Sequence, residues 1–400
     1  MHGARSYHRV LQLGTVDGPI YLDYNATTPV DDRVVAAMMP YFTTRFGNAS
    51  SAHAYGIEAR RAVEEARARV AELIGACPDE MIFTQGGSES DNLALKGIAF
   101  ARWPASTHIV SSAVEHPAVL GTLQYLHDRF GCKFTIVPVD AFGMVSPDAV
   151  KGALRPNTAL VSIMHANNEV GTVNPLRDIA EVVHAAGALL HVDASQSAGK
   201  MDVDVDGLGA DLLTIAGHKL YAPKGIGALY LRRGVFIDPL VHGGGQEGGR
   251  RAGTENVPYI VALGAAATIA RDERPEEERR LTRLRDALHD LLSSQVPGLS
   301  LNGHPTLRAP GTLNVSFPHV AGRMVLDLTP GVAASTGSAC HSAAGEPSGV
   351  LDLMGLSRER AQGAVRLSLG RWTTQDDIEG AASALAAGYF QALDYVGLAG

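Results

Sequence analysis

The chain has 400 residues, of which 46% are hydrophobic and 19% charged, and this balance excludes a disordered or fibrous protein. A formal net charge of −8, without a basic run interleaved with aromatic residues, argues against nucleic-acid binding. The most apolar stretch, Tyr259 to Ala270, is much shorter than the roughly 20 residues that a membrane-spanning helix needs. We therefore expect a globular enzyme with neither a nucleic-acid nor a membrane partner.

Residues 1–18 mix His, Arg, Gly and Ser without a continuous apolar core, which predicts a flexible tail rather than a signal peptide. The three cysteines, Cys77, Cys132 and Cys340, are an odd number at wide separations, which fits neither a disulfide framework nor a zinc site. We expect no bound metal and a cytoplasmic location, where thiols stay reduced. Cys77 and Cys132 are interpreted as small buried hydrophobic residues.

A glycine turn, Thr84 to Asn92, runs into a predicted helix whose first amide groups would face an anion such as phosphate. The signal is weak by itself. The turn is not a Walker loop, because no lysine follows the glycines, and its spacing does not match the dinucleotide fingerprint.

From Thr107 to Leu231 short apolar runs alternate with helical segments, which predicts an α/β architecture with a largely parallel sheet. Most of these runs lack polar alternation, as expected of strands that are covered on both faces. The predicted strands are 108–111, 134–137, 159–163, 188–192, 211–215 and 227–231.

Polar residues follow several of these strands, at the sheet edge where ligands of such folds bind. They are Glu115 and His116, the segments 165–169 and 193–196, and Gly217 to Lys219. His116 is either a satisfied core histidine or, at a strand's carboxyl end, a stacking and proton-handling group.

Lys219 and Asp193 fit the needs of pyridoxal phosphate (PLP), which requires a lysine for its aldehyde and an acid for its pyridine nitrogen. Of the six lysines, only Lys219 lies within a few residues of the end of a buried-looking strand. Asp193 ends an earlier strand of the same predicted sheet. For Asp193 alone, a helix N-cap is an equally good interpretation.

The pattern changes after the small-residue helix at 259–270. A charged segment, 271–290, has apolar residues at helical spacing (Leu281, Leu284, Leu288 and Leu291) and is expected to link two domains. Isolated strands at 312–317 and 365–369 predict a smaller α+β domain. We expect a tail (1–18), a segment that packs on the small domain (19–30), a large domain (31–265) and a small domain (266–400).

Taken together, these motifs resemble those of the cysteine desulfurases and their close relatives, the selenocysteine lyases. The resemblance extends from Tyr21 to Thr374. The matching segments are 21–29, 84–92, 115–116, 167–171, 191–197, 217–219, 251–254, 335–340 and 366–371. Such a set in this order is highly specific.

The resemblance implies a PLP-dependent transferase fold like that of aspartate aminotransferase (fold type I), with a mostly parallel seven-stranded sheet and a homodimeric assembly. It also implies a role for each matched residue. Lys219 would bind the PLP aldehyde and Asp193 the ring nitrogen, while His116 would stack on the ring and Gln196 and Asn168 would contact its substituents. The phosphate would be held by Gly87, Ser88 and His218, with Thr254 from the other subunit. The substrate carboxylate would be bound by Arg366 with Asn168.

Cys340 lies in a run of small polar residues, 335–348, which reads as a mobile loop that carries a sulfur nucleophile. The length of this loop resembles that of the longer-looped desulfurases. The adjacent His341 either lowers the pKa of the thiol or points away from it. The chain departs from many desulfurases at Ala216, where they have a serine that contacts phosphate, and at Gly248, where an arginine is frequent.

The expected reaction converts L-cysteine to L-alanine and leaves the sulfur as a persulfide on Cys340, for transfer to an acceptor protein. Selenocysteine lyase is the alternative enzyme, favoured by Ala216 and by the residues around Cys340. A sulfur-relay protein without turnover should have lost Lys219, Asp193 or Cys340, and all three are present. Iron-sulfur clusters, thiolated tRNA and cofactor synthesis all remain open as destinations of the sulfur.

Overall fold

The computed structural model describes residues 18–105, 107–337 and 349–397. The predicted tail therefore lies almost wholly outside the described residues, as do Cys340, His341 and most of the predicted loop. Among the residues that are described, no helix is both long and apolar enough to cross a membrane.

A seven-stranded sheet forms the centre of the larger part of the molecule, with strand order β2-β8-β7-β6-β5-β3-β4. Only β8 runs antiparallel to its neighbours. Each predicted strand of this region is present, and β2 alone was not predicted: it lies before the alternating region, which begins at Thr107, and it ends at the start of the glycine turn. The strands are β2 (Met81–Thr84), β3 (His108–Ser112), β4 (Lys133–Val137), β5 (Thr158–Met164), β6 (Leu189–Asp193), β7 (Leu212–Ala216) and β8 (Gly227–Leu231).

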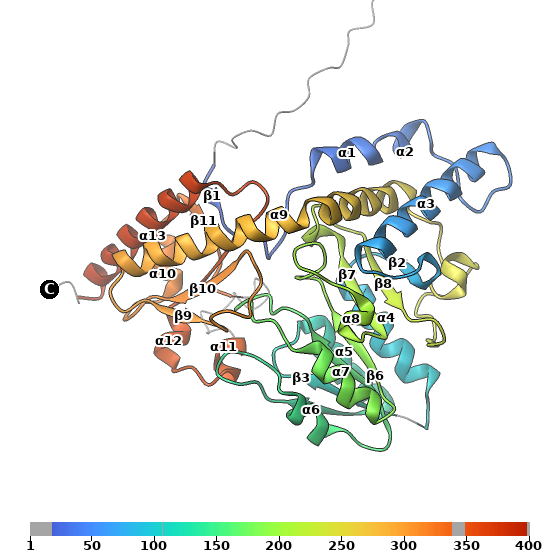
Figure 1. Ribbon diagram of the computed structural model, residues 1–400, viewed down its shortest axis with the longest axis horizontal. Helices are drawn as coiled ribbons and strands as arrows, with labels where there is room; N and C mark the ends of the chain where they lie inside the picture. Colours follow the sequence, from blue (N-terminus) through green and yellow to red (C-terminus); the bar gives the residue numbers. More distant parts are fainter. Residues whose placement is uncertain (1–17, 106, 338–348, 398–400) are drawn as a thin grey trace, which may run out of the picture.

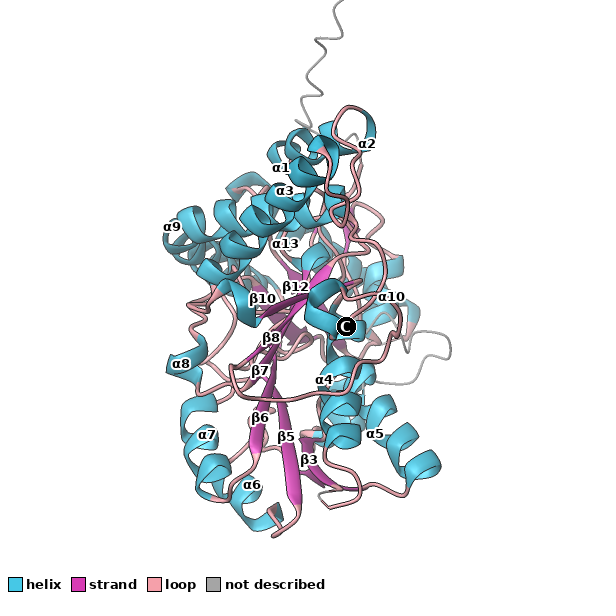
Figure 2. Ribbon diagram, turned by 90° about the vertical axis from the view of Figure 1, so that its right-hand side faces the viewer, coloured by secondary structure: helices cyan, strands magenta, loops and turns pink. Residues whose placement is uncertain are grey.

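Helices cover both faces of this sheet (Figure 2), which explains why its strands are apolar throughout. One face packs against α3 (Ala54–Leu73), α6 (Pro147–Ala153), α7 (Leu176–Ala185) and part of α9 (Val257–Gln295). The other face packs against α4 (Gly87–Ala101) and α5 (Pro117–Phe130). Shorter helices are α1 (Asp32–Met38), α2 (Pro40–Thr43) and α8 (Val205–Leu208).

A second apolar cluster is built on a three-stranded antiparallel sheet with the order β12-β10-β9, covered by α10, α13 and the later part of α9. The first strand of the chain, β1, pairs with β11 beside it. The elements are β1 (Ile20–Tyr21), β9 (Ser300–Asn302), β10 (Thr312–Ser316), α10 (Gly322–Asp327), β11 (Val332–Ala333), α11 (Gly349–Leu353), α12 (Arg358–Gln362), β12 (Ala364–Ser368) and α13 (Gln375–Tyr395).

Helix α9 joins the two clusters without a break, so the small-residue and charged segments form one helix (Figure 1). Its side chains belong to the first cluster up to Ala270 and to the second from Leu281. Leu292, rather than Leu291, completes the apolar stripe, because it lies four positions beyond Leu288. We propose that the two clusters correspond to the two predicted domains, with their division within α9.

The prediction that Cys77 is buried is wrong: Cys77 is exposed where the chain enters a short 3₁₀ turn, whereas Cys132 is buried.

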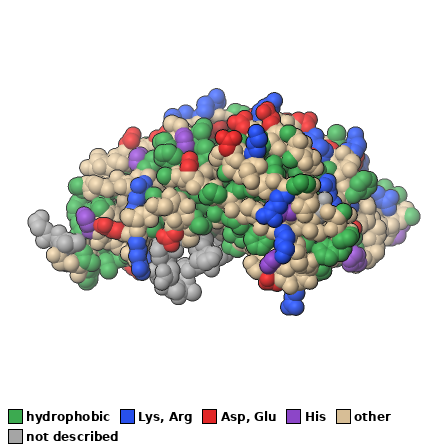
Figure 3. Space-filling model, turned by 90° about the horizontal axis from the view of Figure 1, so that it is seen from below, with side chains coloured by type: hydrophobic (Ala, Val, Ile, Leu, Met, Phe, Trp, Pro, Cys, Tyr) green, Lys and Arg blue, Asp and Glu red, His purple; other side chains and the backbone are tan. Residues whose placement is uncertain are grey.

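On the face of the molecule seen in Figure 3, side chains of both charges lie among apolar and neutral ones.

Candidate active site

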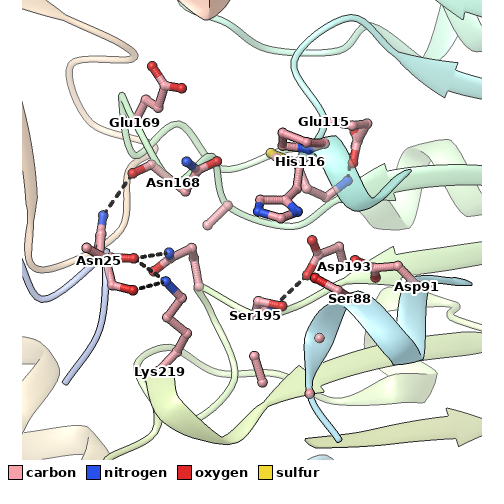
Figure 4. Close-up of a pocket in the computed structure, with 18 of the residues that line it drawn as sticks. Asn25, Ser88, Asp91, Glu115, His116, Asn168, Glu169, Asp193, Ser195 and Lys219 are labelled. Carbon is pink, nitrogen blue, oxygen red and sulfur yellow. Dashed lines mark hydrogen bonds between the residues drawn. The ribbon is translucent and has the colours of Figure 1, made fainter. Parts of the chain in front are cut away.

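A cavity of about 760 Å³ opens at the carboxyl ends of β2, β3, β5, β6 and β7. Each of these parallel strands ends at the same edge of the sheet, so residues far apart in sequence meet there. Of the predicted site residues, the cavity brings together Gly87, Ser88, His116, Asn168, Asp193, Gln196, His218, Lys219 and Arg366. Figure 4 shows Ser88, His116, Asn168, Asp193 and Lys219 around it. Thr254 lines an adjoining cavity instead, and Cys340 is outside the described residues.

Lys219 follows β7 in a short 3₁₀ turn, and its Nζ donates hydrogen bonds to two backbone carbonyls of the segment after β1. One acceptor is the carbonyl oxygen of Ala26, at 2.7 Å, and the other is that of Asn25. The same segment contacts His218, whose Nδ1 lies 3.1 Å from Thr27 Oγ1. The first strand of the chain thus leads directly into a wall of the cavity.

Asp193, the last residue of β6, is buried, and its Oδ1 accepts a hydrogen bond of 2.9 Å from the backbone N–H of Ser195. The sequence left a cap and a ligand contact as alternatives, and the carboxylate both makes this cap-like bond and lines the cavity. His116 caps α5: its Nδ1 accepts from the N–H of Ala118 at 3.1 Å. The neutral imidazole therefore carries its proton on Nε2. Burial lowers the pKa of His116, which favours that neutral form.

Helix α4 begins at Gly87, and no described side chain caps its first turn. The amide groups at Gly87 and Ser88 therefore meet the cavity with the positive end of the helix dipole. The turn packs closely against β6 and β7: a Cβ added at Gly87 would lie 3.1 Å from Ser195 Oγ and 3.2 Å from the Cβ of Ala216. A side chain there would require these neighbours to shift by a few tenths of an ångström, so glycine suits this close approach.

Arg366, in the middle of β12, is only 2% exposed and reaches the cavity from the second cluster. Its Nη2 lies 2.7 Å from Asp23 Oδ1, and its Nη1 donates to the carbonyl oxygen of Asn168 at 3.0 Å. Its Nε has no partner among the residues that the structure describes. An unpartnered buried guanidinium N–H beside a cavity is suited to an anionic ligand.

Several lining residues were absent from the predicted site. Asn25 and Thr27 belong to a segment that the resemblance covered without assigning them a role. Hydrogen bonds of Asn25 to Ser368 in β12 and Thr312 in β10 hold this segment at the cavity. Glu115 was noted after β3 but not assigned, although its carboxyl lines the same cavity. Periodicity and spacing carry no signal for such contacts.

Glu115 is buried, which raises its pKa to about 8 even though Ser112 and the N–H of Met164 donate to Oε1. Its Oε2 has no partner within the described part of the chain. The carboxyl is therefore mostly protonated at neutral pH, and folding takes up a proton between the unfolded pKa of 4.5 and about 8.

A Glu115→Gln variant should therefore differ from the wild type in how its stability depends on pH. The folded wild type holds a proton that the unfolded chain has lost, so its stability falls as pH rises from about 5 to 8, by up to about 1.4 kcal/mol per pH unit. Glutamine cannot titrate, so the variant lacks this fall. Urea unfolding midpoints at several pH values measure the difference.

Glu181→Gln, at an exposed position on α7, is the control and should give a pH curve parallel to that of the wild type. A parallel curve for Glu115→Gln would show that Glu115 is ionised in the folded protein.

Thr254 is exposed and lines a second cavity, which adjoins the main one because Gln85 and Gly225 border both. Near it, Glu247 makes a buried ion pair with Arg67, with Nη–Oε distances of 2.7 and 2.9 Å, and accepts from the N–H of Phe83. Gly248 follows with φ of +65°, a conformation that strains an arginine. The glycine at this departure from the family pattern therefore suits the local backbone.

The fold and the grouping of a lysine, a buried carboxylate and an open helix N-terminus define a PLP-dependent enzyme of the aspartate aminotransferase type. Residues 20–380 match the family model for class-V aminotransferases. The chain is 47% identical to the cysteine desulfurase IscS of Methanosarcina thermophila, over 92% of this chain and 91% of that protein. It is also 47% identical to the IscS of Dictyoglomus turgidum, over 90% and 91%.

Solved structures of related proteins have the same fold as this chain. A NifS-like protein superposes with a TM-score of 0.86 at 38% identity, over 92% of this chain and 98% of that one. SspA in complex with cysteine gives a TM-score of 0.78 at 38% identity, over 88% and 99%. The chain therefore belongs to the cysteine desulfurase family of class-V aminotransferases.

Proposed function

We propose that this protein converts L-cysteine to L-alanine and transfers the sulfur, as a persulfide on Cys340, to an acceptor. The observation that carries this function is the meeting of Lys219, Asp193, the N-terminus of α4 and Arg366 around one cavity. Relatives named cysteine desulfurase and a related structure that holds cysteine support the choice of substrate.

The residues present fit PLP. The uncapped amides of Gly87 and Ser88, with His218, would hold its phosphate, Lys219 its aldehyde carbon and Asp193 its ring nitrogen. His116 and Gln196, with Asn168, would contact the ring and its substituents. When bound, PLP supplies an electron sink that acidifies the Cα–H bond of the amino acid. Ala216 leaves one phosphate contact fewer than a serine would give.

Arg366 would bind the substrate carboxylate with its charged N–H groups, assisted by Asn168. Asp23 is its counter-ion in the protein and keeps the guanidinium facing the cavity edge. Gripping the carboxylate fixes the amino acid at a point remote from its sulfur, so the side chain is oriented toward the incoming thiol.

Lys219 would take the Cα proton as general base and later return a proton to the product carbon. The thiolate of Cys340 would attack the substrate sulfur: an S–S bond forms, the substrate C–S bond breaks, and its electron pair stays on the alanine carbon skeleton. Neutral His116, with its proton on Nε2, would supply and recover protons during these steps.

Thr254 would complete the phosphate site of a second copy of the chain in a homodimer. This role is supported by the exposure of Thr254, which does not line the main cavity of its own chain. The persulfide would then pass to a sulfur-acceptor protein by attack of an acceptor thiolate on the outer sulfur of Cys340.

The direct test incubates the PLP-loaded protein with L-cysteine and measures alanine, with and without a reductant. With reductant, alanine and sulfide should form repeatedly in equal amounts. Without it, alanine should stop at about one equivalent, because the persulfide remains on Cys340. No alanine under either condition contradicts the proposed function, whereas turnover with selenocysteine alone identifies a selenocysteine lyase.

A further inference from the structure

Lys200 is a lysine beside the active site that the proposed reaction does not use. It follows the turn after β6, and its Nζ donates a hydrogen bond of 2.9 Å to Oε1 of Gln196. Lys200 does not line the main cavity: it borders a small cleft behind Gln196, together with Asn25, Tyr221 and Arg371. The hydrogen bond to Gln196 therefore gives Lys200 a direct link to a side chain that lines the main cavity.

The two neighbours of Gln196 fix the direction of its side-chain amide. A lysine ammonium only donates hydrogen bonds, so it requires the amide oxygen. On the other side, Gln196 Nε2 donates at 3.0 Å to the carbonyl oxygen of Asn25, which only accepts. Both contacts specify the same orientation, and a flipped amide would lose both. The second N–H of Nε2 is left for the cavity that Gln196 lines.

A cation at this position is costly to keep. Lys200 is half-buried, and burial, with the nearby positive charges of Lys219 and Arg366, lowers its pKa to about 7. An apolar side chain of similar length would avoid this cost. The amine performs a task that an apolar side chain cannot perform, namely hydrogen-bond donation to Gln196.

We propose that Lys200 is a positioning residue that locks the amide of Gln196 so that an N–H, and not the oxygen, faces the ring oxygen of PLP. This inference rests on the proposed function, because it assigns a determinant of cofactor binding in the same site. A ring oxygen that carries negative charge needs a donor, and an amide oxygen turned toward it would be repulsive. Loss of the hydrogen bond between Lys200 and Gln196 should therefore lower the affinity for PLP through the changed orientation of Gln196.

The test is a double-mutant cycle with Lys200→Met, Gln196→Ala and the double variant, read as the dissociation constant of PLP and the position of its absorbance band. Each single variant should weaken PLP binding by about fivefold, the effect of one hydrogen bond. The double variant should bind no more weakly than Gln196→Ala, because Lys200 has nothing left to orient. Lys151→Met, at an exposed lysine on α6, should match the wild type.

Independent effects that multiply to about 25-fold in the double variant would overturn the inference, as would a Lys200→Met variant with wild-type affinity and spectrum. If Lys200 had a merely structural role, Lys200→Met would weaken PLP binding by the same factor in the wild type and in Gln196→Ala. Should Lys200→Met give little folded protein, Gln196→Glu provides a second arm. Its carboxylate keeps Lys200 paired but offers no N–H and repels a negatively charged ring oxygen, so PLP should bind at least as weakly as in Gln196→Ala; wild-type affinity contradicts the proposal. A wild-type protein that binds no PLP would instead refute the proposed function.

Discussion

Replacing Lys219 by alanine should abolish the absorbance band of lysine-bound PLP and reduce alanine formation from cysteine by about a thousandfold or more. The amine is both the attachment point of the cofactor aldehyde and the proposed base for the Cα proton, and base catalysis alone contributes roughly 10²- to 10⁴-fold. Its placement supports both tasks, since Nζ lies at the cavity edge, held by the carbonyl oxygens of Asn25 and Ala26. Spectra and single-turnover assays of the purified variant measure the two losses.

Lys151→Ala is the matched control, because this lysine is exposed on α6, and it should keep both band and rate. An unchanged spectrum in Lys219→Ala would remove the cofactor assignment. If Lys219→Ala lost the absorbance band but kept the rate of alanine formation, Lys219 would still be the attachment point of PLP. The proton transfer would then belong to another group, such as His116.

Replacing Cys340 by serine should leave the PLP band intact and abolish sulfide release from cysteine. A serine hydroxyl stays protonated at neutral pH and is a poor nucleophile toward sulfur, so the substrate C–S bond has no acceptor for its sulfur. The effect should exceed about a thousandfold, measured as sulfide and alanine under reductant. The persulfide itself can be detected by mass spectrometry on the wild type and should be absent from the variant.

Cys77→Ser is the control, because this cysteine is exposed and lies in a short turn away from the cavity. Full cysteine activity in Cys340→Ser would exclude Cys340 as the sulfur acceptor. If that variant also cleaved selenocysteine, the selenocysteine lyase alternative would be favoured, since selenium leaves without a cysteine nucleophile.

The sequence predicted the sheet well because its strands are covered on both faces and therefore stand out as apolar runs. It also predicted that polar residues after these runs would meet, because parallel strands end at one edge of a sheet. It could not place residues whose contacts depend on other parts of the chain. Cys77 was wrongly expected to be buried, because composition does not reveal which side of a helix end faces solvent.

By itself the sequence determined the family, and through that resemblance it predicted the lysine, the carboxylate and the glycine turn of the site, since these are local patterns in a fixed order. Tertiary structure alone decided what surrounds them. Hydrogen bonds to β10 and β12 hold Asn25 against Lys219, and β12 carries Arg366 to Asp23. Likewise, the protonation of Glu115 and the orientation of Gln196 follow from burial and from hydrogen-bond partners, which are properties of a packed three-dimensional environment and not of residue order.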